Sequence, residues 1–178
     1  MKPTEIHGDL TAEQSFDIAG EVYWVRSEEE FVDILENKVE NGDQIHLTSS
    51  VLVTDTEEIV IDNNIKLVGA CPSSASGPEA NFDGHETTFD RIVANGRVAF
   101  RGISGRRFEI DINYQYSSVK GCVFSNVDVS IDADECFYGL NTNQASVTLE
   151  EDTTNCTVIE DDRVTVINDG DNTVISGS

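Results

Sequence analysis

A short, regular repeat, with a period of about 18–19 positions, is the feature of this sequence that most restricts its fold. Three segments match one another without gaps: FRGISGRRFEIDI (residues 100–112), VKGCVFSNVDVSI (119–131) and FYGLNTNQASVTL (137–149). The alignment places Gly102, Gly121 and Gly139 in one column, and the third segment starts one residue earlier than an exact repeat would. A short fixed period predicts that structural units stack on one another, each burying an apolar face that it could not bury alone.

The second half of each unit alternates between apolar and polar residues, as Val127, Val129 and Ile131 do around Asp128 and Ser130. This period of two predicts a strand with one buried face, and neither half is long enough for a helix. The same apolar columns recur in all units: Phe100, Val119 and Phe137; Ile103, Cys122 and Leu140; Phe108, Val127 and Ala145; Ile110, Val129 and Val147; Ile112, Ile131 and Leu149. A parallel stack of such strands rises about 4.8 Å per coil, and glycine fits a bend that a side chain would obstruct.

The repeat continues beyond the three units with less fidelity. Residues 156–159 and 164–166 continue it downstream, with Val158 in place of the glycine, and residues 67–70 match its start upstream. An insertion at about 71–90 lengthens the upstream coil. The sequence therefore predicts one solenoid domain over residues 25–178, preceded by a polar arm over 1–24.

A helix is expected before the first coil. SEEE (residues 27–30) is a capping box, Phe31, Ile34, Leu35 and Val39 share one helical face, and NGD (41–43) is a stop signal, so the helix is predicted over about 27–41. With this helix and its coils, the chain resembles the right-handed parallel β-helices of the pectate-lyase-like class. The resemblance implies an all-β, single-stranded parallel β-helix with an N-terminal capping helix. Another solenoid is the main alternative, but the strands lack the spacing of leucine-rich repeats.

The charge restricts the partners and suggests the environment. The chain has 34 acidic and 11 basic residues, a formal net charge of −23, with the acids spread from end to end. This composition is typical of a protein from a high-salt organism, because at 1 M salt the Debye length of about 3 Å screens self-repulsion. An ordinary acidic protein at low salt is the alternative. The negative field excludes nucleic acid as a partner, and no apolar run is long enough to insert into a membrane.

The four cysteines, at 71, 122, 136 and 156, contain no CxxC pair, so a zinc cluster is not expected. Cys122 shares a column with Ile103 and Leu140, and it is predicted, like Cys156, to be a small buried hydrophobe. Cys136 beside a turn and Cys71 in the insertion are expected to be more exposed. No two cysteines align on facing positions, so no disulfide is predicted.

Outward positions are where a ligand is expected. Arg101, Lys120 and Tyr138 align in one outward column, with Arg106 and Arg107 at the next turn. This ladder of two cations and an aromatic ring suits a saccharide or carboxylate ligand. The alternative is that these bases pair with neighbouring acids. The insertion adds Phe82, His85 and Phe89, which either form a partner-binding tip or, for the rings, fold back over the coil edge.

Clustered acids raise the question of a bound cation. Glu109, Asp111 and Asp128 are predicted on an outward face, followed by Asp132 and Asp134 in a turn. Hard cations take oxygen ligands from such clusters. The resemblance to pectate lyases implies calcium on such a sheet, with Arg106 as the base. Because nearly one residue in five is acidic, the cluster is a weak signal, and the expectation is no cofactor, with calcium as the alternative.

The fold also resembles viral β-helical surface modules, which implies a structural and adhesive virion protein: a capsid decoration, turret or spike of a virus infecting a halophilic host. The polar N-terminus has no features of a secretory or transit peptide, as expected for a particle assembled in the host cytoplasm. The arm and the end of the last coil are expected to contact other subunits of a homo-oligomer, with a host glycan or surface layer as ligand. A polysaccharide lyase or hydrolase and a cytoplasmic binding or scaffold module are the alternatives.

Overall fold

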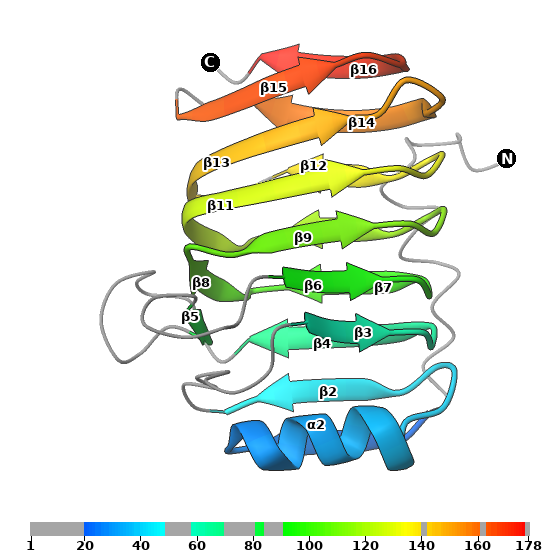
Figure 1. Cartoon of the computed structure of the whole chain (residues 1–178), viewed down its shortest axis with the longest axis vertical. Coiled ribbons are helices and arrows are strands. Elements are labelled where there is room, and N and C mark those ends of the chain that lie inside the picture. Colours follow the sequence, from blue (N-terminus) through cyan, green and yellow to red (C-terminus); the bar gives the residue numbers. More distant parts are fainter. Residues whose placement is uncertain are drawn as a thin grey trace, which may run out of the picture.

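The computed structural model describes residues 20–48, 58–69, 81–83, 91–139, 142–160 and 163–176, which wind into a parallel β-solenoid of about six turns (Figure 1). One helix, α2 (Glu28–Asn37), accompanies the strands. The strands are β1 (Val22–Val25), β2 (Gln44–Leu47), β3 (Glu58–Ile61), β4 (Ile65–Gly69), β5 (Phe82–Asp83), β6 (Arg91–Ala94), β7 (Val98–Arg101), β8 (Ser104–Arg106), β9 (Glu109–Ile112), β10 (Ser118–Lys120), β11 (Val123–Ile131), β12 (Phe137–Gly139), β13 (Thr142–Leu149), β14 (Thr154–Glu160), β15 (Val164–Asn168) and β16 (Asp171–Ser176).

Two parallel sheets form the long walls of the solenoid. Sheet A has the order β1-β2-β4-β7-β10-β12-β14-β16, and sheet B has the order β15-β13-β11-β9-β6-β3. The short strands β5 and β8 pair with each other, and β8 pairs with the start of β11, which makes a third side. In Figure 1 the strands of sheet B run to the right in front and the chain climbs from α2 to β16, which is a right-handed coil. The predicted all-β parallel solenoid is confirmed.

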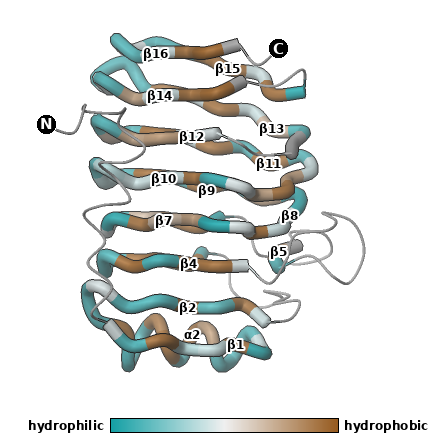
Figure 2. The backbone as a smooth tube through the Cα atoms, turned by 180° about the vertical axis from the view of Figure 1, so that it is seen from behind, coloured by the Kyte–Doolittle hydropathy of each residue, from teal (hydrophilic) through white to brown (hydrophobic). Residues whose placement is uncertain are grey.

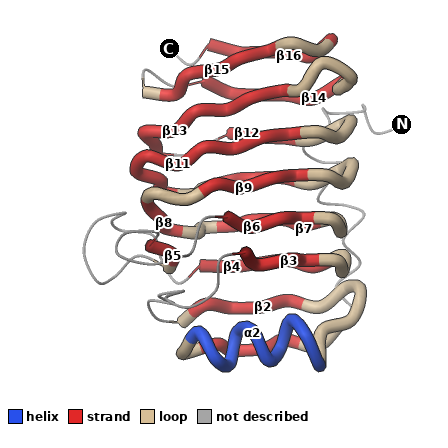
Figure 3. The backbone as a smooth tube through the Cα atoms, in the orientation of Figure 1, coloured by secondary structure: helices blue, strands red, loops and turns tan. Residues whose placement is uncertain are grey.

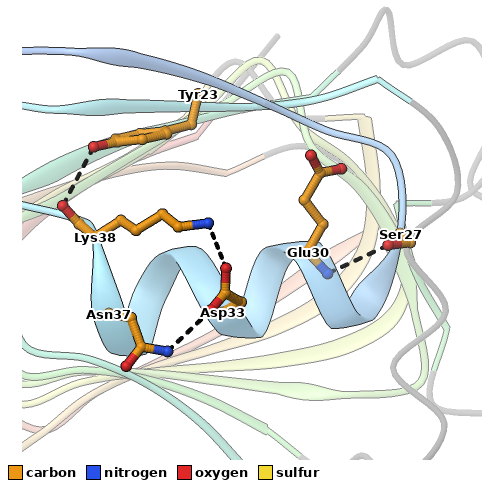
Figure 4. Close-up of polar contacts among 6 residues, drawn as sticks. All are labelled: Tyr23, Ser27, Glu30, Asp33, Asn37 and Lys38. Carbon is orange, nitrogen blue, oxygen red and sulfur yellow. Dashed lines mark hydrogen bonds and ion pairs between the residues drawn. The ribbon is translucent and has the colours of Figure 1, made fainter.

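Helix α2 lies across the first coils and closes that end of the solenoid (Figure 3). The Ser27 hydroxyl accepts from the Glu30 N–H at 3.3 Å, and the Glu30 carboxylate accepts from the Arg26 N–H at 2.9 Å, one residue before the expected partner. Asp33 binds the Asn37 amide and the Lys38 ammonium, while the Tyr23 hydroxyl donates to the Lys38 carbonyl (Figure 4).

The helix ends at Asn37, four residues before the predicted end. Lys38 leaves helical geometry with φ −130, and the N–H groups of Lys38 and Val39 both donate to the Ile34 carbonyl. Val39 then packs against the core, as predicted for the apolar face. On the other side of the helix, residues 22–24, which the predicted boundary placed in the arm, belong to β1.

The core is one continuous column of apolar side chains inside the coils, and polar and apolar residues alternate along the sheet A strands seen in Figure 2. A stack of phenylalanine rings runs through it, with centroids 5.9 Å apart for Phe31 and Phe82, 5.7 Å for Phe82 and Phe108, and 6.1 Å for Phe108 and Phe124. Phe82 is therefore a core residue and not an exposed ligand contact, because its ring fills the interior beside the helix.

The register of the third repeat differs from the prediction. Tyr138 pairs with Val119, which pairs with Phe100, so Tyr138 points inward and is 0% exposed. Phe137 pairs with Ser118, so it lies on the opposite face of sheet A, where it is also buried (6% exposed). The sequence alignment assigned the two aromatic residues the opposite way, and the outward column predicted for Tyr138 is wrong.

A bulge in β11 explains the difference. Ser125 pairs with Gln144, but Val127 pairs with Ala145, which leaves Asn126 unpaired with φ 59. The repeat therefore shortens by one residue inside β11, after the sheet A strands, and not before Tyr138. The sequence alignment placed this shortening before Tyr138. Every side chain between that point and the true position of the bulge is therefore assigned to the wrong face of its strand, because successive residues of a strand point to opposite faces.

The glycine column and the cysteines change accordingly. Gly102 and Gly121 are aligned, both with positive φ (57 and 66), but Gly139 occupies the position of Lys120. Cys136, predicted to be exposed, is buried, and its N–H donates to Cys156 Sγ on the adjacent coil. Cys122 and Cys156 are buried as predicted, while Cys71 lies outside the described residues.

Candidate ligand-binding groove

A groove of about 660 Å³ runs along sheet B beside the corner between β8 and β9. The sheet register places Arg91, Glu109 and Asp128 side by side on β6, β9 and β11. These residues present charges of both signs across three coils. The groove is lined by Glu58, Arg91, Arg107, Phe108, Glu109, Asn126 and Asp128.

The corner of the groove is built from two non-glycine residues in the left-handed region. Arg107 has φ 58 and Asn126, on the next coil, has φ 59. The Arg107 N–H donates to the carbonyls of Ser125 and Asn126, at 3.1 and 3.0 Å. Such backbone is strained for a residue with a side chain, so stacked hydrogen bonds hold the corner in place.

Ion pairs neutralise part of the groove. Arg91 Nε lies 2.6 Å from Glu58 Oε2, and its Nη1 lies 3.5 Å from Asp111 Oδ2. The hydrogen bond to Glu58 raises the pKa of Arg91, while burial raises the pKa of Asp111 against the opposing effect of Arg91. Arg91 is therefore paired with the neighbouring acids Glu58 and Asp111.

Arg101 and Lys120 are adjacent on sheet A, on the other wall from the groove. Their column continues with Gly139 on one side and Val68 on the other, not with Tyr138. Beyond Val68 lie the rings of His46 and Trp24, whose centroids are 4.6 Å apart. The aromatic end of this column is therefore at the first coil.

Arg106 ends β8 on the third side of the solenoid, where it pairs with Ser125 of β11. It thus lies between the sheet A column and the groove, and Arg107 follows it at the corner. The predicted cations are distributed over three faces. His85 and Phe89 lie outside the described residues.

The predicted acidic residues also separate. Glu109 and Asp128 are neighbours in the groove, whereas Asp132 faces a second groove of about 370 Å³ that also holds Asp111 and Glu150. Asp134 Oδ1 accepts from the N–H and hydroxyl of Thr154, at 2.7 and 2.9 Å, and thereby joins two coils. Over the described ranges, no three His, Cys, Asp or Glu residues are grouped to hold a metal ion.

Sequence reasoning missed Glu58 and Arg91. Both occupy the position of Glu109 on earlier coils, and Arg91 precedes Glu109 by one repeat period, so extending the repeat upstream could have found it. It also missed a polar ladder along one corner, where the Asn113 amide donates to Asn95 and the Asn95 amide to Asp62, both at 3.1 Å.

Comparisons of the chain with protein-family models, curated proteins and solved structures give no match. Within the part of the chain that the structure describes, no helix is long and apolar enough to cross a membrane.

Proposed function

We propose that this chain is a structural and adhesive subunit that joins other copies through the ends of its solenoid. Five of the seven large apolar residues exposed in the described ranges lie on terminal strands. They are Val22 (45% exposed) and Trp24 (58%) on β1, Ile167 (46%) on β15, and Val174 (37%) and Ile175 (48%) on β16. This concentration at the ends is the observation that carries the proposal.

The backbone at these ends supports the same conclusion. β1 and β16 are the first and last strands of sheet A, so each has one edge without a strand partner among the described residues. Val174 occupies the inward position of Val158, which is fully buried one coil below. Unpaired edges and exposed core positions are what solenoid proteins cover with a cap or a neighbouring chain.

The assembly that we propose is on a virion surface, as a decoration, turret or spike of a virus with a halophilic host. A net charge of −23 opposes contact between copies at low salt, and molar salt screens that repulsion. The sheet B groove and the Arg101–Lys120 pair on sheet A are the surfaces that we assign to a host glycan or surface-layer ligand.

The test is the assembly state of the full chain, measured by analytical ultracentrifugation in molar and in dilute KCl. We expect oligomers in molar salt that dissociate on dilution of the salt. Trp24→Lys and Ile175→Lys should weaken them, whereas Tyr114→Lys is a matched control because Tyr114 is also exposed (41%) but lies between β9 and β10. A monomer at every salt concentration, or equal loss in the control, would overturn the proposal.

A polysaccharide lyase or hydrolase is the second candidate, favoured by the Glu109 and Asp128 carboxylates beside Arg107 in one groove. It predicts turnover of an acidic polysaccharide that Glu109→Gln abolishes, and absence of turnover excludes it. The third candidate is a cellular scaffold module. Such a protein would also assemble, but its gene would not lie beside capsid genes.

A further inference from the structure

Two cysteines occupy the same corner position on adjacent coils. Cys136 directly precedes β12 residue Phe137, and Cys156 directly precedes Thr157, the partner of Phe137 in β14. Each follows a residue in the left-handed region, Glu135 (φ 55) or Asn155 (φ 58). The repeated backbone turn therefore brings the two thiols to one place, although they lie a full coil apart in the sequence.

Cys156 lies directly against Cys136. Its Sγ accepts a hydrogen bond from the Cys136 N–H at 3.4 Å, and each thiol shifts the pKa of the other through a side-chain hydrogen bond. Neighbouring parallel strands are about 4.8 Å apart, and disulfides bridge Cα atoms about 4.4–6.8 Å apart. A disulfide between them therefore needs rotation of the side chains but no displacement of the coils.

The environment makes the two sulfurs chemically different. The hydrogen bond from Cys136 lowers the pKa of Cys156, so Cys156 is the sulfur that carries negative charge more readily. The hydrogen bond to Cys156, together with burial, raises the pKa of Cys136. A thiolate is the attacking species in disulfide exchange.

We propose that Cys136 and Cys156 form a disulfide that staples two adjacent coils near the C-terminal end of the solenoid. The Cys156 thiolate attacks one sulfur of a small disulfide such as oxidised glutathione, forming a mixed disulfide and releasing one glutathione thiolate. That thiolate takes the proton of Cys136, whose sulfur then displaces the second glutathione. The protein loses two electrons and two protons, and one glutathione disulfide becomes two thiols.

The disulfide would link the residue directly before β12 to β14, one coil below the terminal strand β16. It closes a loop of about 20 residues, which removes conformational freedom from the unfolded chain. Both thiols are buried, so oxidation of the folded protein requires local opening of the last coils. The alternative to a disulfide is a purely structural role, in which Cys156 Sγ only accepts the hydrogen bond from the Cys136 N–H.

The test is refolding of the full chain from denaturant in a glutathione redox buffer, which removes burial as a barrier, followed by intact mass and peptide mapping. We expect the loss of two hydrogens, a peptide cross-link between Cys136 and Cys156, and a melting temperature about 6 °C or more above that of the reduced protein. Cys156→Ser, whose hydroxyl can still accept from Cys136, should lose the cross-link.

Cys122→Ser is the matched control, because Cys122 is equally buried but lies on another corner and should leave the cross-link intact. Cys71→Ser should also leave the cross-link intact. Four thiols remaining after refolding, a persistent glutathione adduct on Cys136 or Cys156, or a cross-link that uses Cys71 or Cys122 would each overturn the proposal.

Discussion

Replacing Gly105 with alanine should destabilise the solenoid, because the new methyl group would enter space that the ring of Phe108 occupies. An added Cβ at Gly105 would lie 2.3 Å from Phe108 Cε1 and 2.8 Å from its Cζ. The ring cannot move away easily, since Phe82 packs on it at 5.7 Å and Phe124 meets it edge-on at 6.1 Å. One of these buried rings must shift to accommodate the methyl group.

The size of the effect follows from two opposing contributions. Overpacking a core costs about 1–3 kcal/mol, while Gly→Ala restricts the unfolded chain and returns about 0.4–1 kcal/mol. We therefore expect Gly105→Ala to lower the free energy of unfolding by about 1–2 kcal/mol. For a chain of this length, that is a fall of about 2–8 °C in melting temperature.

A double-mutant cycle isolates the clash. Phe108→Ala alone should cost about 3–5 kcal/mol, because it leaves a cavity in the phenylalanine stack. In that background the methyl group at Gly105 meets no ring, so the second substitution should be neutral or stabilising. The assay is urea unfolding followed by circular dichroism, in molar KCl, and Phe108→Leu replaces Phe108→Ala if the latter does not fold.

An equal cost of Gly105→Ala with and without the Phe108 ring would rule out the clash. Additive costs would mean that the alanine is strained by its backbone alone. A stabilising effect in the wild-type background would mean that the phenylalanine rings rearrange without a loss of stability.

Three further outcomes are expected. Ser27→Ala should lower stability by about 1 kcal/mol in thermal unfolding, because the Glu30 N–H loses its acceptor. Burial raises the pKa of Cys122 to about 12. The contribution of the neutral thiol to the free energy of unfolding is therefore complete below the unfolded pKa of about 8.5 and is lost as pH rises through 12. Unfolding titrations should therefore show an alkaline loss that Cys122→Ala reduces. Arg91→Ala should cost less than about 1 kcal/mol, and less in high salt, because its ion pair with Glu58 is half-exposed.

Part of the site was predictable from the sequence. The repeat identified Glu109 and Asp128 as neighbours on one outward face, and it placed Arg107 at a turn, so three groove residues were found in advance. Glu58 and Arg91 were not found. The insertion separates Glu58 from the regular coils, whereas Arg91 lies one repeat period before Glu109 and needed only an upstream extension of the repeat.

Residue type alone misplaced the aromatic residues. The sequence left Phe82 either at a partner-binding loop tip or folded back over the coil edge, and its ring packs in the core beside α2. Tyr138 and Phe137 are both large and apolar enough for either face, so composition could not choose between them. The choice depends on where the repeat shortens by one residue, which is at the bulge in β11.

The sequence by itself determined the architecture. Its period sets the length of each coil, its alternation makes strands with one buried face, and its capping residues begin the helix that closes the first coil. These are local properties, which neighbouring residues encode directly.

Tertiary structure alone decided the register between coils. The bulge at Asn126 leaves one residue unpaired, and only the hydrogen bonds between β11 and β13 fix its position. The pairing of β12 with β10 places Tyr138 on the inner face and Phe137 on the opposite face, and the stacked corners bring Cys136 against Cys156. Contacts between coils join residues that are distant in the sequence, and a shift of one position exchanges the two faces of a strand without changing the pattern along it.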